Sequence, residues 1–433
     1  MKNWPLDGKL SGSFKLDIAP QQISLYDLIL SQQEDGEALL SANINWDEDF
    51  KKKQNELIIS VNSVDLSKWT KFLSSMDLSK SQNPTKVEVV LNKVNWNKLQ
   101  GEQLKLHGNL GSGEFVGNAT ASFPYDTSLI LEGKYRLSDK HLTAKTSFGS
   151  ADLLALIHSS MTNDNIYLPK KNFKKIQLSG QLDVLPSMTE LDIRVGSLDQ
   201  AQVLGKISYI PTSKKYITNL KIENLDASSY YDVSDNILPD LYKLFTGKKK
   251  LEGAQNPYIF EVKLDLNKFN ILNTPFDRVQ LHASYQNNDL TISTFDVLQS
   301  TDNTFSFNGK IKNFAQASST YEENQMKAKL TDFDLAKKLG IELSEYLTQG
   351  FNQLNIKGVY SGTNEVGQLD TTIKADDAEL TLVGEVKQLF SNPQLNQTNA
   401  RLIHPNLARL VALFWPTVHL FNEDPAISVD EKA

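Results

Sequence analysis

Apolar and polar residues alternate with a period of two along most of the chain. From Phe260 to Leu266 every second residue is apolar and the residues between them are charged. This alternation is typical of a β-sheet with one apolar face and one wet face, whereas strands buried on both faces form unbroken apolar runs. The same period recurs at 10–18, 57–61, 129–137, 176–184, 191–195, 279–285 and 305–311.

Turn-forming residues separate many of these segments. Examples are Asn287-Asn288-Asp289, Gly111-Ser112-Gly113 and the run 361–364. Such clusters between strands indicate β-hairpins, so we expect an antiparallel meander. Helical patterns are sparse, and the second expected helix has Ser150 near its start as a cap. The expected helices lie at 67–76, 151–161, 238–245, 335–347 and 407–414.

Two kinds of sequence unit alternate along the chain. The first kind is anchored by Gly12, Gly180 and Gly358, which are 168 and 178 residues apart. The second kind fills the two gaps, and its copies align Trp96 with Phe269, Leu104 with Val279, and Leu106 with Leu281. Such a period predicts that each unit stacks on the previous one. We predict one elongated repeat protein over 1–433, with units at about 1–78, 85–162, 174–247, 257–347 and 350–421.

The predicted fold is mainly β. We expect a long, curled, mostly antiparallel repeat sheet that forms a groove, with a few short helices at the repeat ends. A sheet with one apolar face has to cover that face. Either the sheet folds on itself into a sandwich and the apolar residues form a core, or it curls into a trough whose apolar lining stays open and holds acyl chains. Alternation alone leaves both arrangements open.

Several segments share one arrangement of strands, short turns and strand-end motifs. The stretches 6–17 (LDGKLSGSFKLD) and 279–311 (VQLHASY to FNGKI) each join strands through short turns, and strands end in motifs such as DLSKW, DASSYY, DFDLAK and HPNLAR. In this style the chain resembles the AsmA-like family of Gram-negative envelope proteins, which includes TamB, and more distantly the β-groove lipid-transfer proteins of eukaryotes. The resemblance extends over most of the chain.

The resemblance implies a taco-shaped β-groove in the periplasm that conducts phospholipid between the inner and outer membranes. Its partners would be phospholipid acyl chains and membrane or envelope proteins at either end. The family's N-terminal membrane anchor is not in this sequence, so we expect tethering to the inner membrane through a segment outside it. The predicted groove-lining residues are Phe14, Leu16, Leu178, Leu182, Phe260, Val262, Leu264, Leu266, Val279, Leu281, Phe305 and Phe307.

The composition of the chain argues against several classes of protein. The chain of 433 residues has 45 Lys and Arg against 52 Asp and Glu, a net charge of −7, which argues against a nucleic-acid partner. It contains no cysteine, which excludes disulfides, thiol catalysis and cysteine-ligated metals. No stretch reaches the roughly 18 apolar residues of a membrane span. The most apolar segment, 407–421, contains Pro416, and both an interfacial role and capping of the sheet fit it.

Motifs for catalysis are absent from the sequence. The six histidines show no close metal-ligand spacing, and there is neither a G-x-S-x-G nor a complete Walker A motif. We therefore expect no catalytic residue, no metal site and no cofactor. The basic patch at Lys170, Lys171, Lys174 and Lys175 fits a solvated linker or contact with anionic headgroups.

Three functions follow as hypotheses. The first is a non-enzymatic conduit or carrier for phospholipid. The second is a scaffold that assists outer-membrane protein assembly by presenting a sheet edge to client strands. The third is an extracellular adhesin or glycan-binding β-sandwich, which a dry and closed core would favour.

Overall fold

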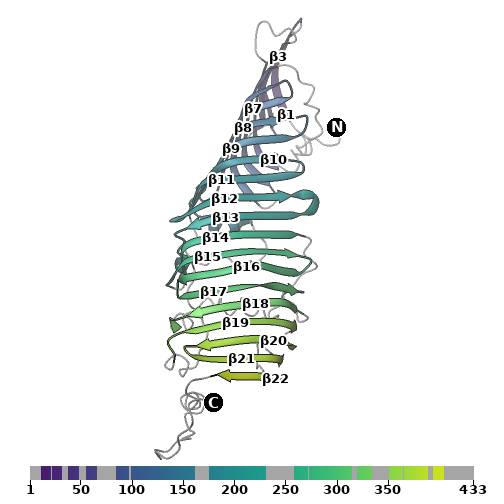
Figure 1. Ribbon diagram of the computed structural model, residues 1–433. Helices are drawn as coiled ribbons and strands as arrows, with labels where there is room; N and C mark the ends of the chain where they lie inside the picture. The colour runs from purple at the N-terminus through teal and green to yellow at the C-terminus, as the bar shows by residue number, and fades with distance from the viewer. Residues whose placement is uncertain are drawn as a thin grey trace, which may run out of the picture. The chain divides into compact units, whose positions relative to one another are not determined.

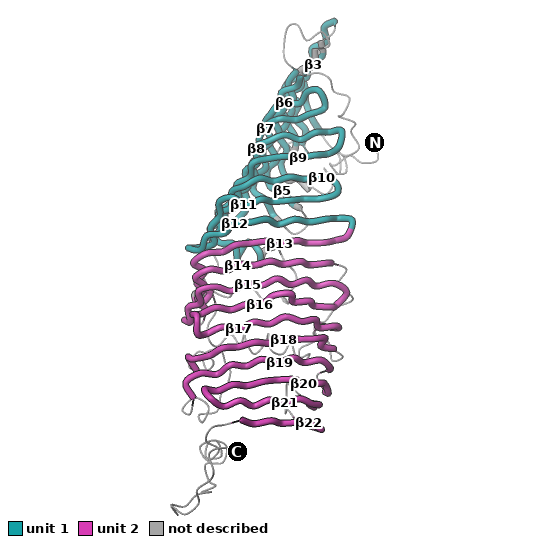
Figure 2. Tube along the Cα trace, in the orientation of Figure 1, with its two compact units in different colours: residues 1–212 teal, residues 213–433 magenta. Residues whose placement is uncertain are grey.

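A computed structural model describes residues 11–20, 22–31, 38–47, 55–65, 84–96, 99–160, 175–230, 258–271, 273–314, 319–333, 351–363, 365–388 and 394–403. These residues contain 22 strands, one α-helix and two 3-10 turns. The chain divides into two compact units, unit 1 over residues 1–212 and unit 2 over residues 213–433 (Figure 2).

Unit 1 contains strands that pair with their sequence neighbours, one beside the next (Figure 1). All these pairs are antiparallel except β4–β5, which is parallel. Its elements are β1 (Ser11–Ala19), β2 (Gln22–Ser31), β3 (Ala38–Asp47), β4 (Asn55–Asp65), β5 (Thr85–Trp96), β6 (Leu99–Gly111), β7 (Glu114–Phe123), β8 (Thr127–Arg136), β9 (His141–Ser150), α2 (Leu153–Ser160), β10 (Ile176–Leu185), β11 (Met188–Leu198) and β12 (Ala201–Ile210), followed by the turn η2 (Pro211–Ser213).

Unit 2 has the same design. Its strands again pair in sequence order, and all pairs are antiparallel except the parallel pair β13–β14. Its elements are β13 (Lys215–Glu223), the turn η3 (Ala227–Ser229), β14 (Ile259–Ile271), β15 (Thr274–Gln286), β16 (Asp289–Ser300), β17 (Asn303–Lys312), β18 (Thr320–Leu330), β19 (Leu354–Thr363), β20 (Val366–Ala375), β21 (Ala378–Lys387) and β22 (Gln394–Ile403). The predicted fold class, a mainly β and mostly antiparallel repeat sheet with few helices, is confirmed.

The strands fall into groups along the sequence. Residues 1–78, 174–247 and 350–421 each contain four described strands, and residues 85–162 and 257–347 each contain five. The two parallel pairs, β4–β5 and β13–β14, both join a four-strand group to a five-strand group. The connection from β9 to β10 instead runs through α2 to an antiparallel neighbour.

The two five-strand groups share one register. Leu91 pairs with Leu104 in the first group, and Leu266 pairs with Val279 in the second, with each residue 175 positions further along. The alignments of Leu104 and Leu106 therefore agree with the structure. The alignment of Trp96 with Phe269 is wrong. Trp96 pairs with Leu99 at the end of its hairpin, and the residue in the same position of the second group is Ile271, which pairs with Thr274. Equivalent positions in the two groups are therefore set by the distance from the hairpin turn, and the presence of an aromatic residue at both Trp96 and Phe269 does not make them equivalent.

The hairpin between β15 and β16 illustrates why turn residues were informative. Asn287 and Asn288 have φ of 53° and 66°, the left-handed region that a two-residue hairpin turn requires. Asparagine tolerates this region better than most residues because its short polar side chain bonds locally. The predicted hairpin at this position is confirmed.

Helix α2 agrees in position with the second expected helix but has a different cap. The side chain of Asp152 accepts a hydrogen bond from the amide of Ala155 at 2.9 Å, so Asp152 is the capping residue. Ser150 was predicted in this role, but its hydroxyl lies 2.8 Å from that of Thr127, across the strand pair β8–β9. The other four expected helices lie outside the described residues, as do segment 407–421 and Lys170, Lys171 and Lys174.

Candidate functional site

In unit 2 the strand registers align apolar residues into a row that crosses all ten strands. Residues directly opposite each other on paired strands share one face of the sheet. At about 4.8 Å per strand, nine steps make this row about 43 Å long. We call it the central row, and its members from β13 to β22 are Ile222, Leu266, Val279, Val297, Phe305, Ala328, Ile356, Ile373, Leu380 and Leu402.

A second row runs beside the central row on the same face. Thr371 is its one hydroxyl residue, and the Thr371 hydroxyl donates to the carbonyl of Lys357 at 2.9 Å. The two rows form an apolar band two residues wide. The second row consists of Leu220, Leu264, Leu281, Phe295, Phe307, Met326, Gly358, Thr371, Leu382 and Ala400.

The apolar side chains of this band are not enclosed. From β13 to β21 those of the central row are half-buried, and Leu402 on β22 is exposed. In the second row only Thr371 is fully buried. A β-sandwich would bury the same positions in a core about 10 Å thick. Half-burial of the central row from β13 to β21 therefore distinguishes this surface from a closed core.

The fully buried apolar side chains of unit 2 lie toward the ends of the strands. At one end Ile311, Tyr321 and Tyr360 form a cluster. Burial raises the pKa of Tyr360, whose hydroxyl donates to the carbonyl of Thr363. Further buried side chains lie near the other strand ends, at Phe276, Leu354, Ala375 and Ala378. The tightly packed parts of unit 2 are thus its margins, and the middle of the face remains accessible.

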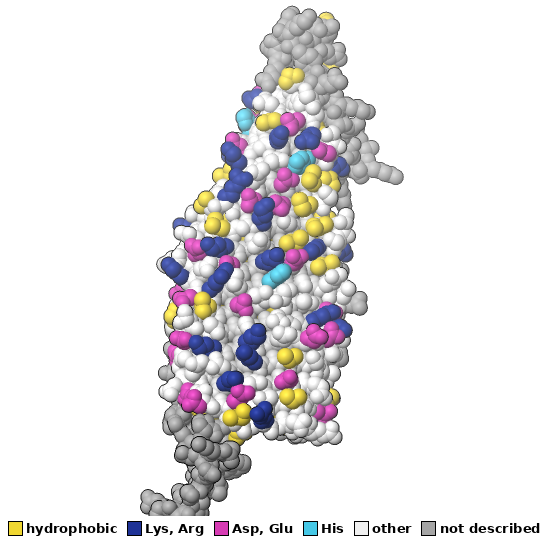
Figure 3. All heavy atoms as spheres, in the orientation of Figure 1, with side chains coloured by type: hydrophobic (Ala, Val, Ile, Leu, Met, Phe, Trp, Pro, Cys, Tyr) yellow, Lys and Arg dark blue, Asp and Glu magenta, His cyan; other side chains and the backbone are white. Residues whose placement is uncertain are grey.

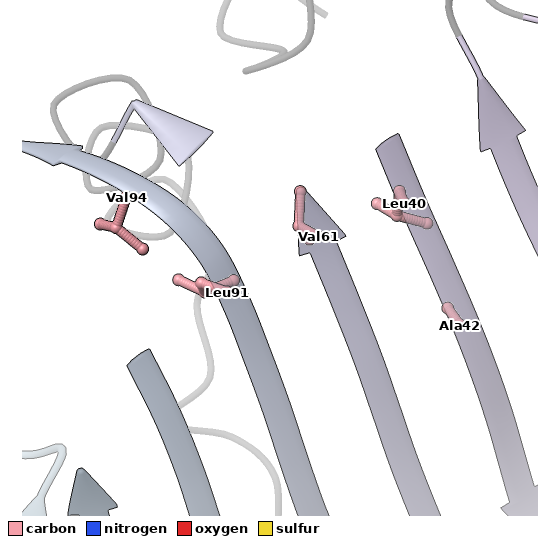
Figure 4. Close-up of a cluster of buried hydrophobic side chains, with 5 residues drawn as sticks. All are labelled: Leu40, Ala42, Val61, Leu91 and Val94. Carbon is pink, nitrogen blue, oxygen red and sulfur yellow. The ribbon is translucent and has the colours of Figure 1, made fainter. Parts of the chain in front are cut away.

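Unit 1 has a comparable row but a different degree of burial. On β3, β4 and β5 its members Leu40, Val61 and Leu91 are 7%, 0% and 8% exposed and form a cluster with Ala42 and Val94 (Figure 4). From β7 to β10 the members are half-buried. The row runs from β2 to β10 through Leu30, Leu40, Val61, Leu91, Leu104, Ala121, Leu129, Phe148 and Leu178.

A stripe of glycine interrupts the apolar face of unit 1. Gly108, Gly117 and Gly133 lie opposite one another on β6, β7 and β8. A Cβ atom at Gly117 would lie 2.2 Å from the carbonyl oxygen of His107 and 2.6 Å from the Cα of Gly108. The strands approach too closely here for any side chain, so glycine is required.

All twelve predicted lining residues lie on described strands, and none is fully buried. Leu266, Val279 and Phe305 are in the central row, and Leu264, Leu281 and Phe307 are in the second row. The others are near strand ends or in unit 1. Phe260 and Val262 lie on the same face as the band, Leu178 and Leu182 lie on the apolar face of unit 1, and Phe14 and Leu16 on β1 are 59% and 51% exposed.

Aromatic side chains gather at the margin near the start of β14. The ring of Tyr216 stacks on that of Phe260, with centroids 5.5 Å apart, and Tyr258 and Tyr285 lie around them. Burial raises the pKa of Tyr285, and its hydroxyl donates to Asn288 at 2.9 Å. Tyrosine combines an apolar ring with a polar tip, which suits a boundary between an apolar surface and water.

Sequence reasoning named only six of the twenty residues of the band. Met326, Ile356, Ile373 and Leu380 were not selected, although the alternation around Leu380 was visible. Bulges hide other members because an extra residue reverses the alternation. On β18, for example, Tyr321 and Met326 share the apolar face although they are five residues apart, since the register shifts between them.

The opposite face of unit 2 is charged. Arg278 donates two hydrogen bonds to Asp265, at 2.9 and 3.0 Å, and these hold the pKa of Asp265 below its usual value. In the same way the Lys215 ammonium, 2.7 Å from Glu261, lowers the pKa of that carboxyl. Figure 3 shows one face of the molecule, on which side chains of both charges are scattered among hydrophobic and other side chains. Such a face suits contact with water.

The described residues contain no group of three or more metal-ligating side chains. His141 lies beside a carboxylate and a hydroxyl. The Nε2 atom of His141 lies 3.0 Å from Asp183 and 3.2 Å from the Thr143 hydroxyl. Both contacts use one ring nitrogen, whereas a nucleophile–base–acid relay uses both. This arrangement therefore does not form a catalytic triad.

Within the described part of the chain no helix is long and apolar enough to cross a membrane. Neither the protein-family models nor the curated proteins with which the sequence was compared match it.

Proposed function

We propose that this protein is a non-enzymatic conduit or carrier for phospholipid, whose acyl chains bind along the apolar band. The observation that carries the proposal is the unbroken central row across ten strands of unit 2, which is half-buried from β13 to β21. The resemblance of the repeats to AsmA-like envelope proteins supports the same conclusion. An enzyme needs a constellation of reactive groups, whereas the side chains of the band are apolar except for Thr371, whose hydroxyl is bonded to the backbone.

The physical basis is partition. Each acyl methylene transferred from water to an apolar surface is stabilised by about 0.8 kcal/mol. A row about 43 Å long exceeds the roughly 30 Å hydrocarbon core of a bilayer, so it offers more than one acyl-chain length of contact. Because each strand contributes an apolar residue, a chain that moves by one strand loses one contact and gains another. Movement along the band therefore meets no large step in free energy.

The polar headgroup stays in water in this mechanism. Tyr216 and Tyr258 at the margin of the band have rings among apolar neighbours and are partly exposed. These amphipathic side chains suit the level at which a glycerol ester meets water. Phospholipid headgroups accordingly need no specific site on the apolar face.

The proposed location is the periplasm of a Gram-negative envelope, where such a protein would pass phospholipid between the inner and outer membranes. This rests on the resemblance, as does tethering to the inner membrane through a segment outside this sequence. Membrane or envelope proteins at either end are the corresponding partners.

Native mass spectrometry of the purified chain tests acyl-chain binding. We expect co-purified phospholipid with the natural sequence and none with Leu281→Asp, because a carboxylate in the second row would lose hydration against an acyl chain. Leu264→Asp should behave in the same way. Both variants should remain folded by circular dichroism, since these side chains are only half-buried.

His282→Asp is the matched control. His282 is next to Leu281 on β15 but lies on the opposite face, directly across from Lys263. An added carboxylate there faces water and a cation, so lipid should still co-purify. Absence of lipid from the natural chain, or equal lipid in Leu281→Asp, would contradict the proposal.

A second candidate function is a scaffold for outer-membrane protein assembly. Within the described residues β1 pairs with β2 alone, and its side chains Phe14, Leu16 and Ile18 are exposed. A free strand edge beside apolar side chains can add a client strand. Photo-crosslinking from position 16 distinguishes the two functions, because capture of nascent β-barrel chains without lipid would favour the scaffold.

A further inference from the structure

A pocket of about 430 Å³ lies over strands β15 to β19 on the charged face of unit 2. The lining side chains on this face are rich in hydrogen-bond donors: Arg278, Thr304, Ser306, Lys327, Lys329 and Lys357. Asp296 is the one carboxylate among the lining residues. Such a site attracts an anion with several acceptor oxygens.

Two of these lysines face each other directly. Lys327 on β18 pairs with Lys357 on β19, and their neighbours Ala328 and Ile356 belong to the central row, so both lysines project from the charged face. Like charges directly opposite each other on paired strands destabilise a sheet. An anion that binds between them would remove this repulsion.

The other cations of the pocket are neutralised, but these two are not. Arg278 is bonded to Asp265, and Lys329 lies 2.6 Å from Asp302. Among the described residues no ion pair joins Lys327 or Lys357 to a carboxylate. The same-face neighbour of Lys327 on β17 is the hydroxyl residue Ser306, which adds a donor and no negative charge.

We propose that this pocket binds an organic phosphate through Lys327 and Lys357. Ammonium groups act as point charges toward phosphate, and the hydroxyls of Thr304 and Ser306 supply neutral donors beside them. The volume falls in the range of small-molecule sites, roughly 300–1,000 Å³, so it accommodates the body of a phosphate ester as well as its anionic group. Leu298 provides an apolar wall for that body.

The two lysines project from the face of the sheet opposite the apolar band, although the pocket lining also includes the central-row residues Val297, Phe305, Ala328 and Ile356. Phosphate binding and acyl-chain binding are therefore measured separately. The phosphate can belong to a free ester or to a lipid headgroup at a membrane surface. Both sources present the same chemistry, and two probes distinguish them: glycerol 3-phosphate in solution, and vesicles of phosphatidylcholine with and without phosphatidic acid.

The test measures binding of both probes to the full chain and to the double variant Lys327→Gln/Lys357→Gln. We expect at least one phosphate probe to bind the natural chain, with an affinity that falls as salt is raised, and to bind the double variant at least about tenfold more weakly. Glycerol 3-phosphate binding indicates a free ester, and binding only to vesicles with phosphatidic acid indicates a headgroup.

Lys206→Gln serves as the matched control. Lys206 is an exposed lysine on β12 that lies 2.9 Å from Glu190, away from the pocket residues in the sequence. This variant should bind as the natural chain does. Failure of both probes to bind the natural chain, or equal binding by the double variant, would overturn the assignment. Co-purified phospholipid in the same preparations reports on the apolar band separately.

Discussion

The first and second five-strand groups place equivalent leucines in different surroundings. Leu91 on β5 and Leu266 on β14 are 175 residues apart and occupy the same register position. Leu91 belongs to a buried cluster with Leu40 and Val61, whereas Leu266 lies half-buried in the middle of an accessible band. Neither residue type nor strand position distinguishes the two.

The difference shows that the same register position does not produce the same burial. Around Leu91, the partly buried residues Leu28, Ile59 and Val89 complete a compact cluster. In unit 2 the buried cluster of Ile311, Tyr321 and Tyr360 lies near the strand ends, and Leu266 is not part of it and stays half-buried. The same repeat thus supplies a structural core in one place and a candidate binding surface in another.

The largest expected effect comes from charge at the two equivalent positions. Leu91→Asp should destabilise unit 1 by more than about 4 kcal/mol, because it buries an unpaired carboxylate. Leu266→Asp should cost far less, since its carboxylate can reach water, but it should abolish phospholipid co-purification. Urea denaturation and native mass spectrometry of both variants give the two readings. Equal destabilisation would remove the distinction between core and band.

Shortening the same two leucines to alanine tests the difference in burial between them. Leu91→Ala should cost about 2–5 kcal/mol because it removes buried methyl groups and leaves a cavity. Leu266→Ala should cost about 1–1.5 kcal/mol, since only part of its surface is withdrawn from water. The shift in urea midpoint measures both costs, and a larger loss for Leu266→Ala would be inconsistent with an open band.

The glycine stripe provides a second point of comparison. Gly117 on β7 pairs with Gly108 on β6. The equivalent pair in unit 2 is Ile292 on β16 and Ala283 on β15, so the position of Gly117 is occupied there by isoleucine. Gly117→Ala should nevertheless destabilise unit 1 by about 1–3 kcal/mol, because its Cβ would meet the backbone of β6. Thermal unfolding measures this, and an unchanged melting temperature would mean that the strands are further apart.

The smallest expected effect concerns the charged face. Since the pKa of Asp265 is lowered by Arg278, this carboxylate adds stability above the ordinary aspartate pKa of 3.8, and the contribution is lost as the pH falls toward the lowered value. Arg278→Gln should therefore reduce stability at neutral pH by less than about 1 kcal/mol and flatten the acid limb of the stability profile. Denaturation from neutral pH to pH below 3.8 checks this, and parallel profiles would contradict it.

The sequence predicted the strands and turns well for a physical reason. Alternation such as that of Phe260 to Leu266 reports on one strand at a time, and hairpin residues such as Asn287 and Asn288 report on their own backbone. The assignment of Ser150 as a cap failed because its hydroxyl has a cross-strand partner, Thr127, that local sequence does not reveal. The Trp96 alignment failed because residue similarity was weighed above hairpin register.

The apolar band could be predicted only in part. Leu264 and Leu281 follow from alternation, but Met326 is displaced by a bulge whose position depends on the pairing of β18 with β17 and β19. Lys327 and Lys357 are thirty residues apart in the sequence, so their opposition became visible only through the register.

The sequence alone determined a mainly β repeat protein with one apolar and one charged face, because side-chain direction in a strand follows from position. Only the tertiary structure decided which apolar residues are enclosed, as around Val61, and which remain open, as at Phe305. That outcome depends on cross-strand register and on where strands bulge and bend, which are properties of paired strands and cannot be read from any one of them.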